Sequence, residues 1–149
     1  MKRLVAFTLV LVLVLSLCAA AFADYYPTVE FASASKNKLV KYGKKVTLKI
    51  KCNSGTGDFR KTPSNLWRAC FVLNVKKGSY KSELATYGFS GTPTVRHKFS
   101  TDILPEPEAG SMVKYSLTAT SYYRKTIGNL VYLQWHKNKS AKTKLRVYR

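Results

Sequence analysis

The sequence contains few of the residue types on which catalysis and metal binding usually depend. Its 149 residues include seven Asp and Glu, two His and three Cys. It has no Cys-x-x-Cys pair and no Cys/His cluster with the spacing of a zinc site. It also lacks a recognisable nucleophile motif. This shortage of acid, base and ligand groups predicts a protein that is not an enzyme and that requires no metal or cofactor.

Two sets of residues invite a catalytic interpretation, and each fits a structural role better. His97 lies on the apolar side of an alternating segment, where a structural histidine is commoner than a ligand or a base. Glu106 and Glu108 lie in a Leu-Pro-Glu-Pro-Glu stretch. We expect this stretch to be a stiff, exposed connection, in which nothing raises the carboxyl pKa values as catalysis would need.

Basic residues are as abundant as acidic ones are scarce. The chain carries 26 Lys and Arg, and its formal net charge is +19. Such a charge bears on partners and solubility rather than on fold. We expect attraction to anionic polymers, which include cell-wall polymers such as teichoic acids, acidic polysaccharides, lipid headgroups and nucleic acid. Because the lysines are spread along the chain, a solvated surface with no dedicated ligand is an equal alternative.

The first residues have the features of a secretory signal. Lys2 and Arg3 precede an apolar run over 4–17, and Ala21-Phe22-Ala23 provides small residues at the cleavage positions. The run is short for a membrane span, although an uncleaved anchor remains an alternative. We therefore predict a signal peptide over 1–23 and a secreted or cell-wall-associated domain over 24–149. No transmembrane segment is expected after cleavage.

Apolar and polar residues alternate with a period of two through much of the chain. In residues 43–52, Val46, Leu48, Ile50 and Cys52 share one side of an extended strand. A short segment precedes it over 28–31, and similar segments follow over 67–75, 84–89, 94–101, 112–123, 129–137 and 141–149. Turn-forming residues at 76–79, 124–128 and 138–140 separate some of them. No convincing helical period occurs, so the pattern predicts an all-β, antiparallel β-sandwich of seven to eight strands, with a closed barrel as the alternative.

The polar sides of these predicted strands are strongly cationic. Lysine and arginine recur on these sides, with the side chains expected to point into solvent. They are our candidate binding residues: Lys45, Lys49, Lys51, Arg96, Lys98, Lys142, Lys144 and Arg146.

Two cysteines remain once the predicted signal is removed. An even pair in an exported chain predicts a disulfide between Cys52 and Cys70, worth about 3 kcal/mol. The alternation, however, places Cys52 on an apolar strand face and Cys70 on the less apolar face of another strand. A bulge, a Cys52 already in a loop, or a Cys70 strand covered on both sides would resolve the conflict. We favour the second, because turn residues begin at Asn53.

Three features together carry a family resemblance. They are the alternating strand that ends at Cys52, Trp67 on the next long strand, and Tyr115 near the start of a later strand. In these features the chain resembles bacterial secreted immunoglobulin-like domains, where they match the second strand, the core tryptophan and the corner tyrosine. Leu117 stands where that family's second cysteine would lie, and Cys70 comes too early in the chain for its inter-sheet bridge.

The resemblance implies a non-catalytic binding or adhesion module, although a fold does not by itself establish a function. Combined with the charge, it predicts a secreted module that binds anionic cell-wall or extracellular polymers. The alternative is a secreted protein that binds nucleic acid nonspecifically through charge and aromatic stacking. Against it stand the absence of a recognition motif and the predicted export.

Overall fold

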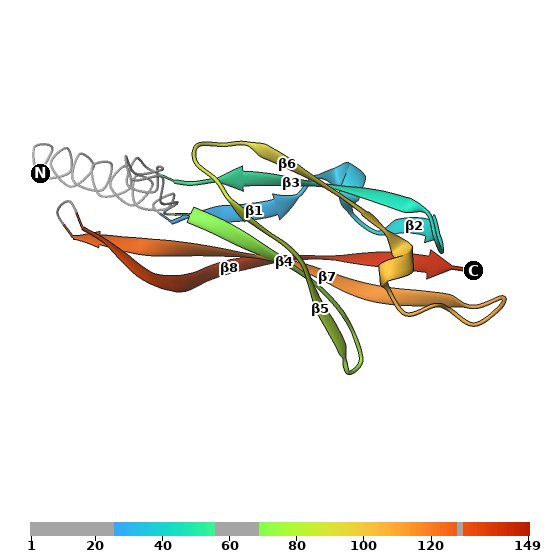
Figure 1. Cartoon of the computed structure of the whole chain (residues 1–149). Helices are drawn as coiled ribbons and strands as arrows, with labels where there is room; N and C mark the ends of the chain where they lie inside the picture. The colour runs from blue at the N-terminus through green and yellow to red at the C-terminus, as the bar shows by residue number, and fades with distance from the viewer. Residues whose placement is uncertain (1–25, 56–68, 128–129) are drawn as a thin grey trace, which may run out of the picture.

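The computed structural model describes residues 26–55, 69–127 and 130–149. The predicted signal peptide over 1–23 and the proposed core residue Trp67 lie outside the described residues. The described part is all-β, with eight strands in two sheets, an arrangement consistent with the predicted β-sandwich. Figure 1 shows the two sheets as separate layers, with β1, β3 and β6 in one and β4, β7 and β8 in the other. No helix in these residues is long and apolar enough to cross a bilayer.

The first sheet is antiparallel and has three strands. Its order is β1 (Thr28–Phe31), β3 (Lys45–Asn53) and β6 (Thr94–Ser100). The inner side of β3 is buried at Val46, Leu48, Ile50 and Cys52, which confirms the alternation read from the sequence. The short 3₁₀ turn η1 (Ser33–Ser35) follows β1, and the Ser35 hydroxyl accepts a hydrogen bond from the Lys49 amide at 2.7 Å.

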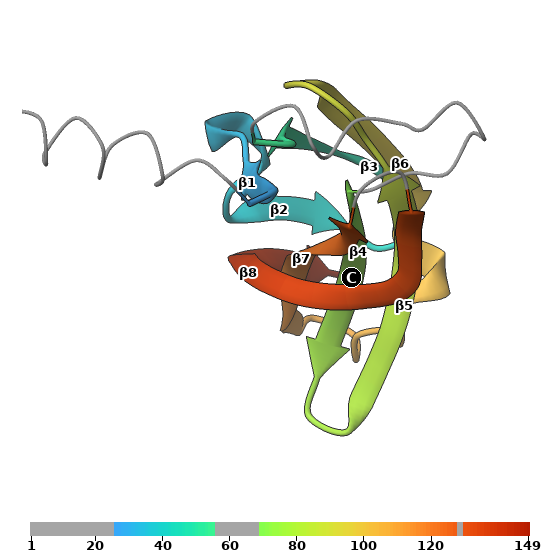
Figure 2. The same cartoon turned by 90° about the vertical axis from the view of Figure 1, so that its left-hand side faces the viewer.

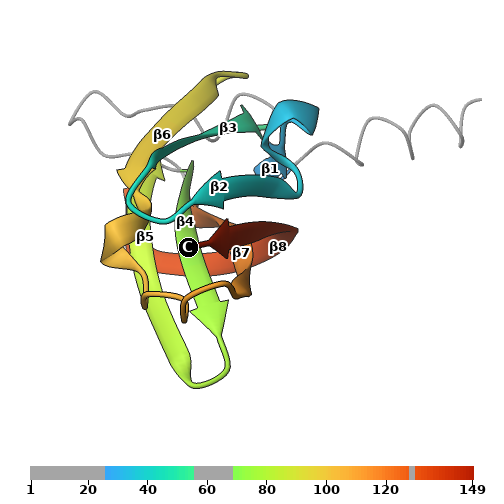
Figure 3. The same ribbon diagram turned by 90° about the vertical axis from the view of Figure 1, so that its right-hand side faces the viewer.

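The second sheet has five strands and contains the two longest in the chain. Its order is β2 (Lys38–Lys41), β8 (Leu130–Tyr148), β7 (Met112–Ile127), β4 (Ala69–Lys77) and β5 (Tyr80–Gly88). Neighbouring strands in this sheet run antiparallel, except that β2 runs parallel to β8. Figure 2 and Figure 3 show β2 lying between β3 and β8, at the side where the two sheets come together.

The core fills the space between the sheets. Leu48 of β3, Phe71 of β4 and Leu117 of β7 are fully buried in one cluster, as the alternation predicts. Burying an aliphatic or aromatic side chain of this size stabilises the fold by about 1.5–3 kcal/mol. The buried inner faces therefore fix which side of every strand points to solvent.

Tyr115 ties the core to the connection between the sheets. After β6 the chain makes the 3₁₀ turn η3 (Thr101–Ile103) and continues to β7. The Tyr115 ring is buried, and its hydroxyl donates a 2.7 Å hydrogen bond to the Pro105 carbonyl. Burial raises the pKa of this phenol, so it remains a donor at neutral pH.

The predicted break at 138–140 is wrong, because β8 runs without interruption through Asn138, Lys139 and Ser140. The predicted break at 124–128 begins too early, because β7 continues to Ile127 before β8 starts at Leu130. The pairing of β7 with β8 shifts register in two places, one between Thr120 and Tyr122, where Ser140 and Lys137 are the partners. Turn-forming residues thus make a β-bulge inside a strand, which bends the strand rather than ending it.

A side chain replaces the missing ladder bonds at this bulge. The Ser121 hydroxyl donates to the Lys139 carbonyl at 3.0 Å and accepts from the Lys139 amide at 3.2 Å. The Asn138 amide group donates to the Pro27 carbonyl at 2.6 Å. The Lys139 backbone and the Asn138 side chain at the bulge therefore find hydrogen-bond partners that are distant in the sequence.

Replacing Ser121 with alanine should destabilise the protein by about 1 kcal/mol, because the half-buried backbone amide and carbonyl of Lys139 lose their partner. Urea unfolding monitored by fluorescence measures the change. Ser116→Ala, at an exposed position of the same strand, is the matched control and should stay within about 0.5 kcal/mol of the parent. Equal stabilities for the two variants would contradict the proposed role of Ser121.

Candidate functional site

The outer side of the first sheet gathers one group of the predicted binding residues. We call Lys45, Lys49, Lys51, Arg96 and Lys98 the first cationic face. β3 and β6 carry them, and all are exposed except Lys49, which is half-buried. Pairing places Lys49 opposite Arg96 and Thr47 opposite Lys98.

The remaining predicted residues lie on the outer side of the second sheet. Lys142, Lys144 and Arg146 of β8 face Thr118, Ser116 and Lys114 of β7. Lys76 of β4 lies beside Ser116, and Lys81 of β5 lies opposite Lys76. The second cationic face comprises Lys76, Lys81, Lys114, Lys142, Lys144 and Arg146. The predicted set is thus divided between two sheets rather than gathered in one place.

Lys76, Lys81 and Lys114 belong to this face but were absent from the predicted set. The alternation over 112–123 already places Lys114 on the polar side, so the signal was present in the sequence. Lys76 was predicted to lie in a turn, whereas β4 continues to Lys77 and β5 begins at Tyr80. Gly78, with a φ of 55°, shortens the connection to a tight turn.

Like charges lie directly opposite one another on both faces. Side chains at such positions have Cβ atoms about 5 Å apart, and equal charges there destabilise a sheet by a few tenths of a kcal/mol per pair. The opposed pairs are Lys49–Arg96, Lys114–Arg146 and Lys76–Lys81. The free protein therefore carries an electrostatic cost on each face.

Of the carboxylates near these pairs, Glu30 of β1 stands opposite Lys51 rather than opposite Lys49 or Arg96. Glu30 pairs with Lys36 at 3.4 Å, and neither side chain is well buried. Glu83 accepts a 2.7 Å hydrogen bond from the Thr86 hydroxyl. Exposed ion pairs contribute little to stability, and Lys36 belongs to neither cationic face.

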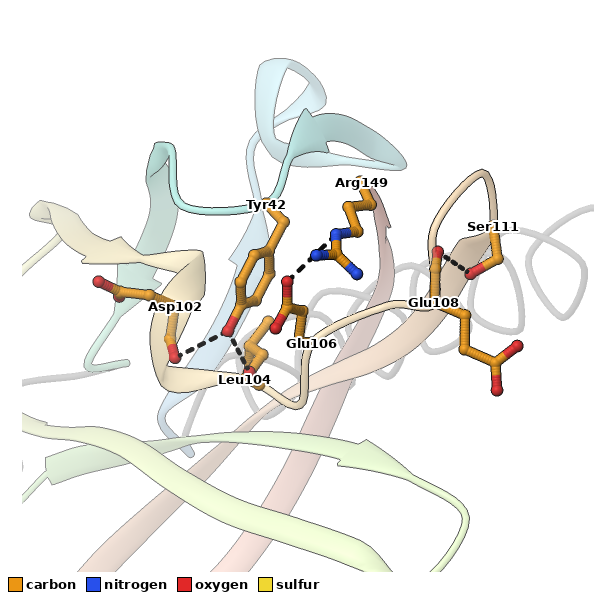
Figure 4. A network of polar contacts seen from close by, with 7 residues as sticks. All are labelled: Tyr42, Asp102, Leu104, Glu106, Glu108, Ser111 and Arg149. Atoms are coloured by element: carbon orange, nitrogen blue, oxygen red, sulfur yellow. Dashed lines mark hydrogen bonds and ion pairs between the residues drawn. The ribbon is translucent and has the colours of Figure 1, made fainter.

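The connection between β6 and β7 contains three acidic residues, Asp102, Glu106 and Glu108. Glu106 Oε1 is 3.2 Å from Arg149 Nε, which ties this connection to the end of β8. The Tyr42 hydroxyl lies 3.4 Å from the carbonyls of Asp102 and Leu104. Figure 4 shows Glu106 turned toward Arg149 while the Glu108 carboxylate points away. The two glutamates are thus not arranged as a paired acid and base.

The predicted disulfide is wrong for this structure, because Cys52 and Cys70 are both free and buried. Cys52 lies within β3 and faces the core, so it is not in a loop. Cys70 lies next to core-facing Phe71 on β4 and therefore points to the other side of the second sheet. The second sheet therefore separates the two thiols. Cys70 is buried even though it lies on the outer side of this sheet.

Burial keeps both thiols protonated. It raises the pKa of Cys52 to about 12, against a lowering effect from a backbone hydrogen bond at Val95. It raises the pKa of Cys70 to about 11, although the Arg124 guanidinium acts in the opposite direction. Since the thiolate is the reactive form, neither cysteine is set up as a nucleophile.

His97 of β6 is half-buried, and its side chain lies against β5. Its Nδ1 lies 2.9 Å from the Tyr87 hydroxyl, and its ring stacks on Phe99 with centroids 5.7 Å apart. Nε2 is buried and has no hydrogen-bond partner among the described residues. Burial lowers the pKa of this imidazole. The predicted structural role fits the packing, although one ring nitrogen stays unsatisfied.

No described group of three or more Cys, His, Asp or Glu residues could hold a metal ion. Comparison with known proteins adds no assignment, because no family model matches the chain and no curated protein matches it significantly.

Free thiols predict a simple alkylation result for the chain from Asp24 onward. Iodoacetamide without reductant should modify both Cys52 and Cys70 in denaturant and neither in the native protein, because burial raises their pKa values to about 12 and about 11. Intact mass spectrometry counts the adducts. An unmodified protein in denaturant, two mass units lighter than the reduced chain, would establish the disulfide instead.

The lowered pKa of His97 predicts a loss of stability in mild acid. The unfolded state takes up a proton below its pKa of about 6.5, whereas the folded state resists protonation until a lower pH. The melting temperature should therefore fall as the pH drops from 7.5 through 6.5 toward 5.5. His97→Gln should flatten this slope, and His136→Gln should retain it. If both variants retain the full slope, His97 is not its source.

Proposed function

We propose that this chain is a secreted, non-catalytic binding or adhesion module that holds anionic cell-wall or extracellular polymers on its outer sheet faces. The opposed cation pairs carry this proposal. They destabilise the free protein, and an anionic chain lying across them would remove the repulsion. A surface that only kept the protein soluble would gain nothing from placing Lys49 opposite Arg96.

We further infer that the sandwich is immunoglobulin-like. The order β1-β3-β6 matches strands A, B and E of that fold, and β8-β7-β4-β5 matches G, F, C and C′. Tyr115 supports the same inference, since its hydroxyl binds a backbone carbonyl upstream of β7, as a corner tyrosine does. Leu117 occupies the usual cysteine position and packs in the core. Such a domain presents its strand faces to a partner without any catalytic group.

Salt dependence is the direct test of the electrostatic part of this proposal. The Debye length falls from about 10 Å at 0.1 M salt to about 3 Å at 1 M, so contacts between exposed charges weaken steeply. We expect binding to immobilised polygalacturonate or to a glycerol phosphate polymer to fall more than tenfold over this range. Retention measured on neutral dextran is the control. Binding that is unchanged by salt would overturn the proposal.

A second titration, with nucleic acid, distinguishes this proposal from the alternative that the protein binds nucleic acid nonspecifically. Single-stranded DNA of matched charge is titrated under the same conditions, and weaker binding than to the cell-wall-type polymer is expected. Equal affinities would reduce the interaction to nonspecific charge.

A further inference from the structure

One line of the second cationic face differs from the rest in its regularity. Lys142, Lys144 and Arg146 project from the outer side of β8 at successive outward positions. Because a strand rises about 3.4 Å per residue, these cations repeat about every 7 Å along the strand. Hydroxyl groups face the two lysines from β7, Thr118 opposite Lys142 and Ser116 opposite Lys144. We call these five residues the β8 track.

Both ends of the β8 track are defined by contacts. At one end the Thr120 and Ser140 hydroxyls bond to each other at 2.8 Å, just before the bulge at Asn138 and Lys139. At the other end the Arg146 guanidinium donates to the Asn37 carbonyl at 3.3 Å, which orients it. The track therefore offers a short run of cations with a contact at each end.

The first cationic face arranges the same groups differently. It also sets lysines opposite hydroxyls, Lys45 opposite Ser100 and Lys98 opposite Thr47. Its cations, however, alternate between β3 and β6, and Lys49 meets Arg96. The β8 track instead holds three consecutive cations on one strand, with the two hydroxyls on the neighbouring strand.

We propose that the β8 track binds an extended polyphosphodiester lying parallel to the strand, an inference that rests on the proposed function and names its ligand class and site. A phosphodiester has one negative charge and two non-bridging oxygens. One oxygen accepts from Lys142 or Lys144, and the other accepts from the hydroxyl opposite. A three-carbon polyol between phosphates spaces the charges at an interval close to that of the track.

A linear carboxylate polymer fits the same residues less well. A carboxylate can pair with the ammonium groups equally well. In such a polymer, however, each carboxylate is attached to a bulky sugar ring, and successive rings turn their carboxylates to different sides of the polymer. Consecutive carboxylates then do not follow one strand. The Ser116 and Thr118 hydroxyls should therefore matter for the phosphate polymer and hardly for the carboxylate polymer.

The test uses the purified protein and oligo(glycerol phosphate) of two to eight units, with affinity measured by calorimetry at several salt concentrations. Affinity should rise steeply until the oligomer spans the three cations and only slowly thereafter. Lys142→Gln with Lys144→Gln should lower affinity at least tenfold and reduce the salt slope by roughly one to two units. Lys44→Gln with Lys77→Gln removes the same charge at exposed positions outside both cationic faces and should cost less than about threefold.

A second variant tests the ligand class. Ser116→Ala with Thr118→Val should weaken oligo(glycerol phosphate) binding about three- to tenfold and leave polygalacturonate binding unchanged. Melting temperatures of all variants verify folding. Equal losses from the two lysine pairs would overturn the track while leaving polyanion binding intact, and a hydroxyl variant without effect would overturn the phosphodiester assignment. If the parent binds no polyanion at all, the proposed function itself fails.

Discussion

The burial of two apolar sheet faces against each other determines the placement of almost every charge in this protein. Leu48 of β3 and Leu117 of β7 lie in one interior with no exposed surface. A slip of one residue in either strand would turn its apolar side chains to solvent and its lysines into the core. The register is therefore strongly specified, and the outward direction of the cationic side chains follows from the packing of the inward ones.

This dependence explains what could be predicted from the sequence. Alternation is a local property, so the buried side of β3, the start of β6 and the cationic side of β8 followed from residue order alone. Partners across strands are not local. The sequence alone could not place Lys49 opposite Arg96, or show that Lys142 would face Thr118.

The wrong predictions have two different causes. Asn138, Lys139 and Ser140 favour a turn in isolation, but Ser121 on the neighbouring strand supplies both hydrogen bonds that the bulged backbone needs. Tertiary contacts thus override a local preference. The two cysteines were paired by counting, whereas their strand positions already placed them on different sides of their sheets. The parity of the alternation was the better guide, and the count was misleading.

The separation of the two thiols has a consequence for how the chain reaches its native state. With Cys52 in the core and Cys70 on the outer side of the second sheet, no covalent cross-link joins the two described cysteines. The two sheets are held together by side-chain packing, strand pairing and hydrogen bonds, none of which requires an oxidant. The assembly of the two sheets therefore does not depend on a bond between Cys52 and Cys70.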